Sequence, residues 1–109
     1  MRPVAAVALI DRGYQNCIPS VVPGWANTAR TGRNGLVLMD SQPHLYAEWL
    51  AAACRQVQTT ASGPGLVFVN AWNEWAEGNH LEPDRENGAA YLEATASVLA
   101  SLQEAPGAF

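Results

Sequence analysis

Residues 66–71 have the sequence Leu-Val-Phe-Val-Asn-Ala, in which apolar side chains follow one another without alternation. Such a run is typical of a strand in a parallel sheet that is covered on both faces. Upstream, residues 18–23 form a short β-branched run, Ile-Pro-Ser-Val-Val-Pro, that is bounded by prolines. This run predicts a second strand, which ends at Pro23-Gly24.

A helix is predicted after each strand. Residues 43–57 repeat apolar side chains every four positions, and Pro43 suits a first helical turn because its missing N–H costs nothing there. The apolar stripe of this helix comprises Leu45, Tyr46, Trp49, Leu50, Ala53, Cys54 and Val57. A second helix is predicted over residues 88–102, with a stripe of Tyr91, Leu92, Thr95, Val98, Leu99 and Leu102.

The segments between these elements carry turn-forming and polar residues. Residues 25–35 contain two glycines, two threonines, two arginines and two asparagines, which predicts a loop. Residues 36–39 are expected to add a minor extended piece. Residues 72–87 are predicted to be a long acidic connection.

The order strand, helix, strand, helix implies parallel pairing and therefore an α/β fold. Two such units do not complete a domain, because a closed (β/α)₈ barrel takes about 250 residues. We therefore expect residues 1–109 to be a single partial domain that belongs to a larger protein or assembles with copies of itself. Residues 1–17 are an unassigned lead-in, and residues 105–109 are expected to fray.

Composition excludes several classes of function. The chain has a formal net charge of -4 and no basic run, which argues against a nucleic-acid partner. It has no apolar stretch of the roughly 20 residues that a transmembrane segment needs. Cys17 and Cys54 show no metal-site or redox spacing, so we expect Cys54 to be a buried free thiol and the location to be cytoplasmic.

Candidate chemistry lies in residues 70–84, directly after the predicted buried strand, where α/β folds build their active sites. Glu74 and Glu77 are three positions apart, a spacing that in a turn or a single helical twist puts both carboxylates over the same patch. Trp72 and Trp75 flank them with apolar surface. Paired carboxylates in different surroundings suit the cleavage of a glycosidic bond, in which one donates a proton and the other acts as base or nucleophile. The alternative is a solvated acidic loop whose tryptophans pack against the sheet.

Three segments resemble a known family in the family's own order. Residues 73–84, Asn-Glu-Trp-Ala-Glu-Gly-Asn-His-Leu-Glu-Pro-Asp, resemble the signature of the WbsX-type domain, which is similar to glycoside hydrolase family 99, the endo-acting α-mannosidases. Residues 23–30, Pro-Gly-Trp-Ala-Asn-Thr-Ala-Arg, resemble that family's upstream motif, Pro-Gly-Trp-Asp-Asn-Thr-Pro-Arg. Further matches lie on the two predicted helices: Pro43, Tyr46, Trp49, Leu50, Gly88, Tyr91, Leu92, Glu93 and Ala94.

The resemblance implies that residues 18–104 are the last two βα units of a (β/α)₈ TIM-type barrel. It also implies that Glu74 and Glu77 are the catalytic pair. Glu74 would deprotonate the sugar 2-hydroxyl to form a 1,2-anhydro sugar, and Glu77 would protonate the leaving oxygen and then serve as base toward water. WbsX-type proteins occur in bacterial surface-polysaccharide gene sets and are often labelled glycosyltransferases, so hydrolysis and transfer both stay open.

Two departures from the family pattern lie in the upstream motif and one in the signature. Ala26 stands where the family has Asp, and Ala29 stands where it has Pro. If that Asp binds sugar hydroxyls, this chain has lost the contact. Ala76 stands where the hydrolases have His between the two glutamates.

The substrate-binding candidates are Trp25, Asn27, Arg30, Asn73, Trp75 and His80. Trp25 is either a sugar platform or a plug at the barrel rim, and Arg30 either grips a ligand or pairs with the acidic loop. His80 is favoured as a hydrogen-bonded loop histidine over a metal ligand. Glu82 and Asp84 are expected to order the loop and to cap the following helix.

A glycan is the expected partner, and neither a cofactor nor a metal is expected. Two further alternatives accompany the enzyme hypothesis. One is a non-catalytic or vestigial glycan-binding module, because a quarter of a barrel does not enclose a substrate. The other is a truncated gene product without a stable fold of its own.

Overall fold

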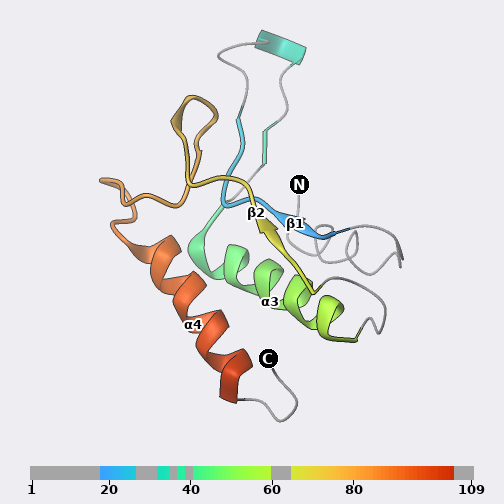
Figure 1. Cartoon of the computed structure of the whole chain (residues 1–109). Coiled ribbons are helices and arrows are strands. Elements are labelled where there is room, and N and C mark those ends of the chain that lie inside the picture. Colours follow the sequence, from blue (N-terminus) through green and yellow to red (C-terminus); the bar gives the residue numbers. More distant parts are fainter. Residues whose placement is uncertain (1–17, 27–31, 35–36, 39–40, 60–64, 105–109) are drawn as a thin grey trace.

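A computed structural model describes residues 18–26, 32–34, 37–38, 41–59 and 65–104 of the chain. Two helices, α3 (Pro43–Thr59) and α4 (Ala90–Glu104), lie beside two short strands, β1 (Ser20–Val21) and β2 (Phe68–Val69) (Figure 1). The predicted lead-in and the predicted frayed tail fall outside the described residues.

Strands β1 and β2 pair in parallel, as the strand–helix order predicts, with Ser20 opposite Phe68 and Val21 opposite Val69. Their pairing extends beyond the strands, because the amide of Phe68 donates to the carbonyl oxygen of Pro19 and that of Asn70 donates to the carbonyl oxygen of Val21, both at 2.9 Å. Helix α3 makes the crossover between them. Parallel pairing places the carboxyl ends of both strands at one edge.

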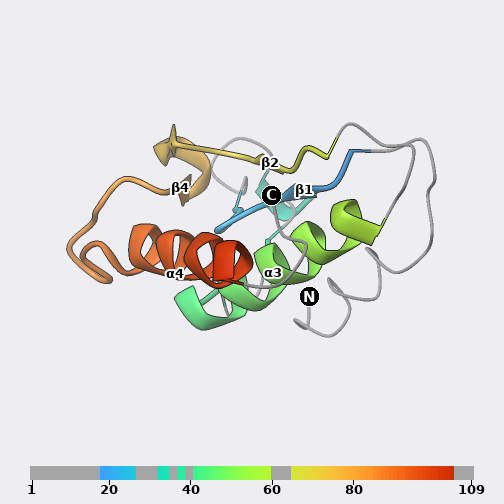
Figure 2. The same ribbon diagram turned by 60° about the horizontal axis from the view of Figure 1, so that its bottom comes forward.

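The two helices lie on the same side of the sheet, where they pack against each other and enclose one core (Figure 2). The buried core residues are Val21, Tyr46, Leu50, Ala53, Cys54, Tyr91, Val98 and Leu102. Both predicted helices are confirmed, although α4 begins and ends two residues later than the pattern indicates. Cys54 is a buried free thiol, as predicted.

A chain of polar groups crosses the interface between the helices. The Tyr46 hydroxyl lies 2.8 Å from the Thr95 hydroxyl, which in turn donates to the carbonyl oxygen of Tyr91 at 2.8 Å. Since the Thr95 proton is used in that second bond, Tyr46 donates in the first. The rings of Tyr46 and Tyr91 also contact each other, tilted by 56° at a centroid distance of 5.6 Å. Buried hydroxyls thus satisfy one another within the core.

Two expectations about burial are wrong. The segment that contains β2 is not covered on both faces, because Leu66 is 50% exposed and Phe68 is 56% exposed. In the described part of the chain the helices cover one side of the sheet, where Val67 and Val69 pack, and the alternate side chains point away from it. Leu99 is 45% exposed, because the face of α4 that meets α3 runs through Tyr91, Val98 and Leu102.

The acidic connection contains structure that the sequence pattern did not predict. Its strands β3 (Asn73–Glu74) and β4 (Asn79–His80) pair antiparallel, and the one-turn helix η2 (Trp75–Glu77) joins them. Gly78 closes η2 in the left-handed region at φ 61° and ψ 28°, which glycine adopts readily. The loop after β1 also contains structure that was not predicted. It includes the short helix η1 (Gly32–Asn34), and Ala26 forms an isolated β-bridge with Val37 at the base of the loop.

The stability of this fold is expected to fall at alkaline pH. Burial raises the pKa of Tyr46, Tyr91 and Cys54. These groups therefore ionise more easily in the unfolded chain than in the folded one. Their contribution to the stability of the fold is complete below about pH 9 and is lost as pH rises further. Denaturant unfolding between pH 7 and pH 11 should show this fall.

Tyr46→Phe should reduce the alkaline fall, and at pH 7 it should cost about 1 kcal/mol for the lost hydrogen bond. Glu48→Gln, at an exposed position of the same helix, serves as the matched control and should leave the pH profile unchanged. A stability that stays constant to pH 11 in the unsubstituted chain would contradict the burial of these groups.

Candidate functional site

The candidate site lies at the edge of the sheet where β1 and β2 end. Residues 72–87, the acidic loop, leave this edge directly after β2. The carbonyl oxygen of Trp72 accepts hydrogen bonds from the amides of Leu81, at 3.0 Å, and Glu82, at 3.2 Å. These two bonds close the base of the β3–β4 hairpin and hold it beside the strand end.

The upstream segment, residues 23–26, meets the hairpin at this same edge. The Ala26 amide donates to the carbonyl oxygen of Glu77 at 2.7 Å. Gly24 lies against Gly78 so closely that a Cβ atom on Gly24 would be 2.6 Å from the Gly78 carbonyl oxygen. The structure therefore brings residues 23–26 of the upstream motif against the signature motif, residues 73–84, and both motifs carry the family resemblance.

The two glutamates occupy unlike environments at either end of η2. Glu74 precedes the helix and is exposed, whereas Glu77 ends it and is only 4% exposed. The backbone of Glu74, at φ -86° and ψ 71°, is not helical, so the two side chains do not follow a single helical register. One carboxylate thus faces water, and the other is covered near the upstream segment.

Asn79 is a buried polar residue that the sequence analysis did not single out. Its side chain is fully buried, and its Oδ1 accepts a hydrogen bond from the Ala71 amide at 3.0 Å. Within the described ranges its Nδ2 has no hydrogen-bond partner. Asn79 therefore ties β4 to the end of β2. The sequence signal, an Asn after a turn glycine, is too common to have identified it.

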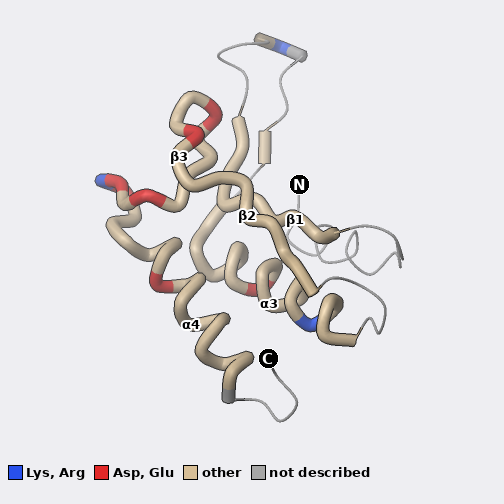
Figure 3. The backbone as a smooth tube through the Cα atoms, viewed as in Figure 1, with Lys and Arg blue, Asp and Glu red and all other residues tan. Residues whose placement is uncertain are grey.

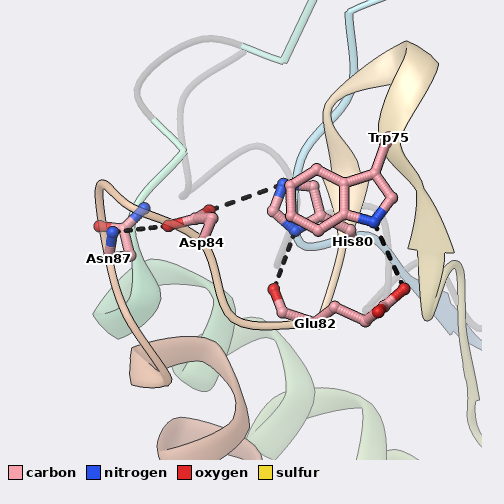
Figure 4. Close-up of polar contacts among 5 residues, drawn as sticks. All are labelled: Trp75, His80, Glu82, Asp84 and Asn87. Atoms are coloured by element: carbon pink, nitrogen blue, oxygen red, sulfur yellow. Dashed lines mark hydrogen bonds and ion pairs between the residues drawn. The ribbon is translucent and has the colours of Figure 1, made fainter.

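Trp75 and His80 form a stacked pair on one side of the hairpin (Figure 4). Their ring centroids are 3.6 Å apart and the planes are 15° from parallel. Trp75 Nε1 donates to Glu82 Oε1 at 3.3 Å, and His80 Nδ1 lies 3.1 Å from the Glu82 carbonyl oxygen. His80 Nε2 lies 3.6 Å from Asp84 Oδ2. His80 is thus a hydrogen-bonded loop histidine, as the sequence analysis favoured.

Asp84 orders the end of the acidic loop. Its Oδ1 accepts from the Asn87 amide at 2.6 Å, and its backbone pairs with that of Gly88 through two hydrogen bonds. The loop-ordering role expected for Glu82 and Asp84 agrees with these contacts. The amide that Asp84 binds belongs to Asn87, three residues before α4 begins at Ala90, and not to the first turn of the helix as the capping expectation required.

Of the remaining substrate-binding candidates, the structure describes two and leaves two outside its described residues. Trp25 is half-buried, and its carbonyl oxygen accepts from the Leu38 amide at 2.8 Å. Its Nε1 is buried without a hydrogen-bond partner in the described part of the chain. Asn73 is exposed and lies opposite His80 in the hairpin. Asn27 and Arg30 lie outside the described residues.

The charge of the chain is concentrated at this site (Figure 3). The acidic loop contains five carboxylates and one arginine, and the other five carboxylates of the chain are balanced by five arginines. The whole net charge of -4 therefore belongs to the acidic loop. Among the described residues, no group of three or more His, Cys, Asp or Glu side chains is arranged to hold a metal ion. No described helix is long and apolar enough to cross a bilayer.

Gly24→Ala should separate the upstream segment from the hairpin, because the added methyl group meets a backbone carbonyl rather than a movable side chain. We expect a loss of about 1–3 kcal/mol in the free energy of unfolding, typical of overpacking. We also expect faster hydrogen exchange at the Ala26 amide. Gly88→Ala is the matched control: it strains a positive φ but meets open space away from this contact. Unchanged exchange at Ala26 in Gly24→Ala would contradict the contact.

Comparison with known proteins identifies the family. Residues 4–95 match the family model described as glycosyltransferase WbsX. Two curated relatives, each named uncharacterized protein WxcX and coming from strains of Xanthomonas campestris pv. campestris, are 43% identical over 82 residues. That alignment covers 74% of this chain but only 12% of the length of each relative. No solved structure was found to match. Because the family model matches most of the length of this chain, the chain belongs to the WbsX glycosyltransferase family.

Proposed function

We propose that the chain is part of a carbohydrate-active enzyme whose acidic loop acts on glycosidic bonds. The observation that carries this proposal is the hydrogen bond from Ala26 to Glu77, which joins the upstream segment to the carboxylate-bearing hairpin. The two segments come from different strands and meet at the carboxyl edge of the sheet. Active sites of α/β folds are assembled at this edge from the ends of several strands. Family membership supports a glycan as the ligand.

We propose further that the described units belong to a (β/α)₈-type barrel. Two features support this: β1 and β2 are parallel with α3 as crossover, and among the described residues the side of the sheet opposite the helices is uncovered. Leu66 and Phe68 lie on that open side, where the interior of a barrel would surround them. The covering residues would come from further βα units of a longer protein or from another copy of this chain.

Glu74 and Glu77 are proposed to divide the chemistry between them. The exposed Glu74 would act on the sugar 2-hydroxyl as base. The covered Glu77 would donate the proton to the leaving oxygen, as one carboxyl of the pair does in glycosidic bond cleavage. The scheme follows glycoside hydrolase family 99 and needs no cofactor. If the acceptor is a second sugar rather than water, the same donor-side steps give transfer.

The concentrated negative charge favours some sugars over others. An anionic sugar such as a uronic acid would be repelled by a loop that holds the entire net charge of the chain. Neutral or amino sugars would meet no such repulsion. We therefore propose neutral or amino sugars as the substrate class, with bacterial surface-polysaccharide metabolism as the setting that the family suggests. The cytoplasmic location stays a prediction.

A non-catalytic glycan-binding role is the second candidate. The observation in its favour is that Trp72 is 54% exposed and Trp75 is 49% exposed, whereas Glu77 is covered. Exposed indole faces bind the apolar C–H faces of sugar rings without any chemistry. The experiment below separates this role from the catalytic one.

Glu74→Gln and Glu77→Gln should each lower kcat by roughly 10²–10⁴-fold, because each removes a proton-transfer group while keeping its shape. The measurement is turnover of a fluorescently labelled α-mannooligosaccharide by the protein as its gene encodes it. Glu86→Gln, an exposed position of the same acidic loop, is the control and should retain full turnover. Binding without turnover in the unsubstituted protein would favour the second candidate, and full turnover in both variants would disprove the catalytic assignment.

A further inference from the structure

Trp75 combines high exposure with a fixed orientation. Its side chain is 49% exposed, yet one face of the indole is stacked on His80 and its Nε1 is bonded to Glu82. A surface tryptophan normally samples several rotamers, and a ligand that uses it must restrict that motion. Here the restriction is already made by the acidic loop itself. The indole therefore presents a single open face.

His80 is committed to contacts within the loop. One ring nitrogen is within hydrogen-bond reach of the Glu82 carbonyl oxygen, and the other faces the carboxylate of Asp84 at 3.6 Å. The side chain is 13% exposed, and its ring plane is occupied by the indole of Trp75. One ring nitrogen is thus hydrogen-bonded, the other lies against a carboxylate, and one face of the imidazole is covered by the indole.

We propose that His80 is a positioning residue: it backs one face of Trp75 so that the opposite face is held ready for a sugar ring. This inference rests on the proposed function, because it takes a glycan as the ligand. It changes the role that the sequence suggested for His80, from a direct substrate contact to a support for one. Glu82 assists by fixing the edge of the same indole.

The geometry favours support over direct contact for a simple reason. A histidine that binds a sugar hydroxyl needs a ring nitrogen that is free to donate or accept. In this structure both nitrogens of His80 are turned toward acceptors of the acidic loop. A support, in contrast, needs only a flat ring of the right size in the right place. Phenylalanine supplies that ring without any nitrogen, and this difference makes the two roles separable.

The test uses the full chain and compares the unsubstituted protein with single-residue variants of it. Five proteins are prepared: the unsubstituted chain, His80→Phe, His80→Ala, Trp75→Phe for assignment, and His44→Ala as the control at an exposed histidine on α3. Heteronuclear NMR follows the Trp75 indole N–H, which a Trp75→Phe spectrum assigns. The probes are mannotriose, maltotriose and chitotriose. Backbone resonances of β1 and β2 report whether each variant keeps its fold.

The stack is tested first, without any glycan. The ring protons of His80 should be shifted upfield by the indole current relative to those of His44, which has no such neighbour among the ring contacts of the described residues. If the two histidines have the same ring shifts, the stack is absent and the inference is overturned, whatever becomes of the proposed function.

Glycan binding is tested second. At least one trisaccharide should shift the Trp75 indole resonance in the unsubstituted chain and in His44→Ala. His80→Phe should keep that affinity, and His80→Ala should weaken it by roughly two- to tenfold, the range expected for loss of an aromatic partner. If His80→Phe loses binding as His80→Ala does, His80 contacts the ligand through nitrogen and the inference is wrong. If the stack is present but no trisaccharide shifts Trp75, the glycan role of this surface fails, and the inference fails with it.

Discussion

The parallel pairing of β1 with β2 is the constraint on which the rest of the structure depends. It is short, but the bonds from Phe68 to Pro19 and from Asn70 to Val21 fix its register. Because the pairing is parallel, both strands end at one edge, and the chain segments that follow them must start side by side. Helices α3 and α4 pack on one side of this pair and hold it through a common core.

The close approach of the two segments beyond that edge follows from this pairing. Gly24 lacks the side chain that would collide with Gly78, so the upstream segment reaches the hairpin and Ala26 bonds to Glu77. Asn79 secures the hairpin from the other side through Ala71. The carboxylates, the indoles and the net negative charge are thereby gathered at one place, which is the physical basis for proposing a glycan site there.

Periodicity predicted the elements that depend on local pattern. Helix α3 begins at Pro43 as its first-turn proline indicates, and the parallel order of the strands follows from strand–helix alternation. The hairpin escaped prediction because it depends on the left-handed backbone of Gly78 and on long-range bonds that no periodicity encodes. The exposure of Phe68 was not predicted for a different reason. A continuous apolar run indicates that both faces of a strand are buried, but it does not indicate which residues bury them. The stack of His80 on Trp75 likewise arises only when the hairpin forms.

A scalar coupling across the hydrogen bond between the Ala26 amide and the Glu77 carbonyl tests the central claim most directly. NMR detects such a coupling only when the two groups are bonded. We expect this coupling to be present, together with the coupling from Phe68 to Pro19 that reports the parallel strands. If the strand coupling is found and the Ala26 amide shows none while exchanging at the rate of a solvent-exposed amide, the two motifs do not meet and the proposed site does not exist.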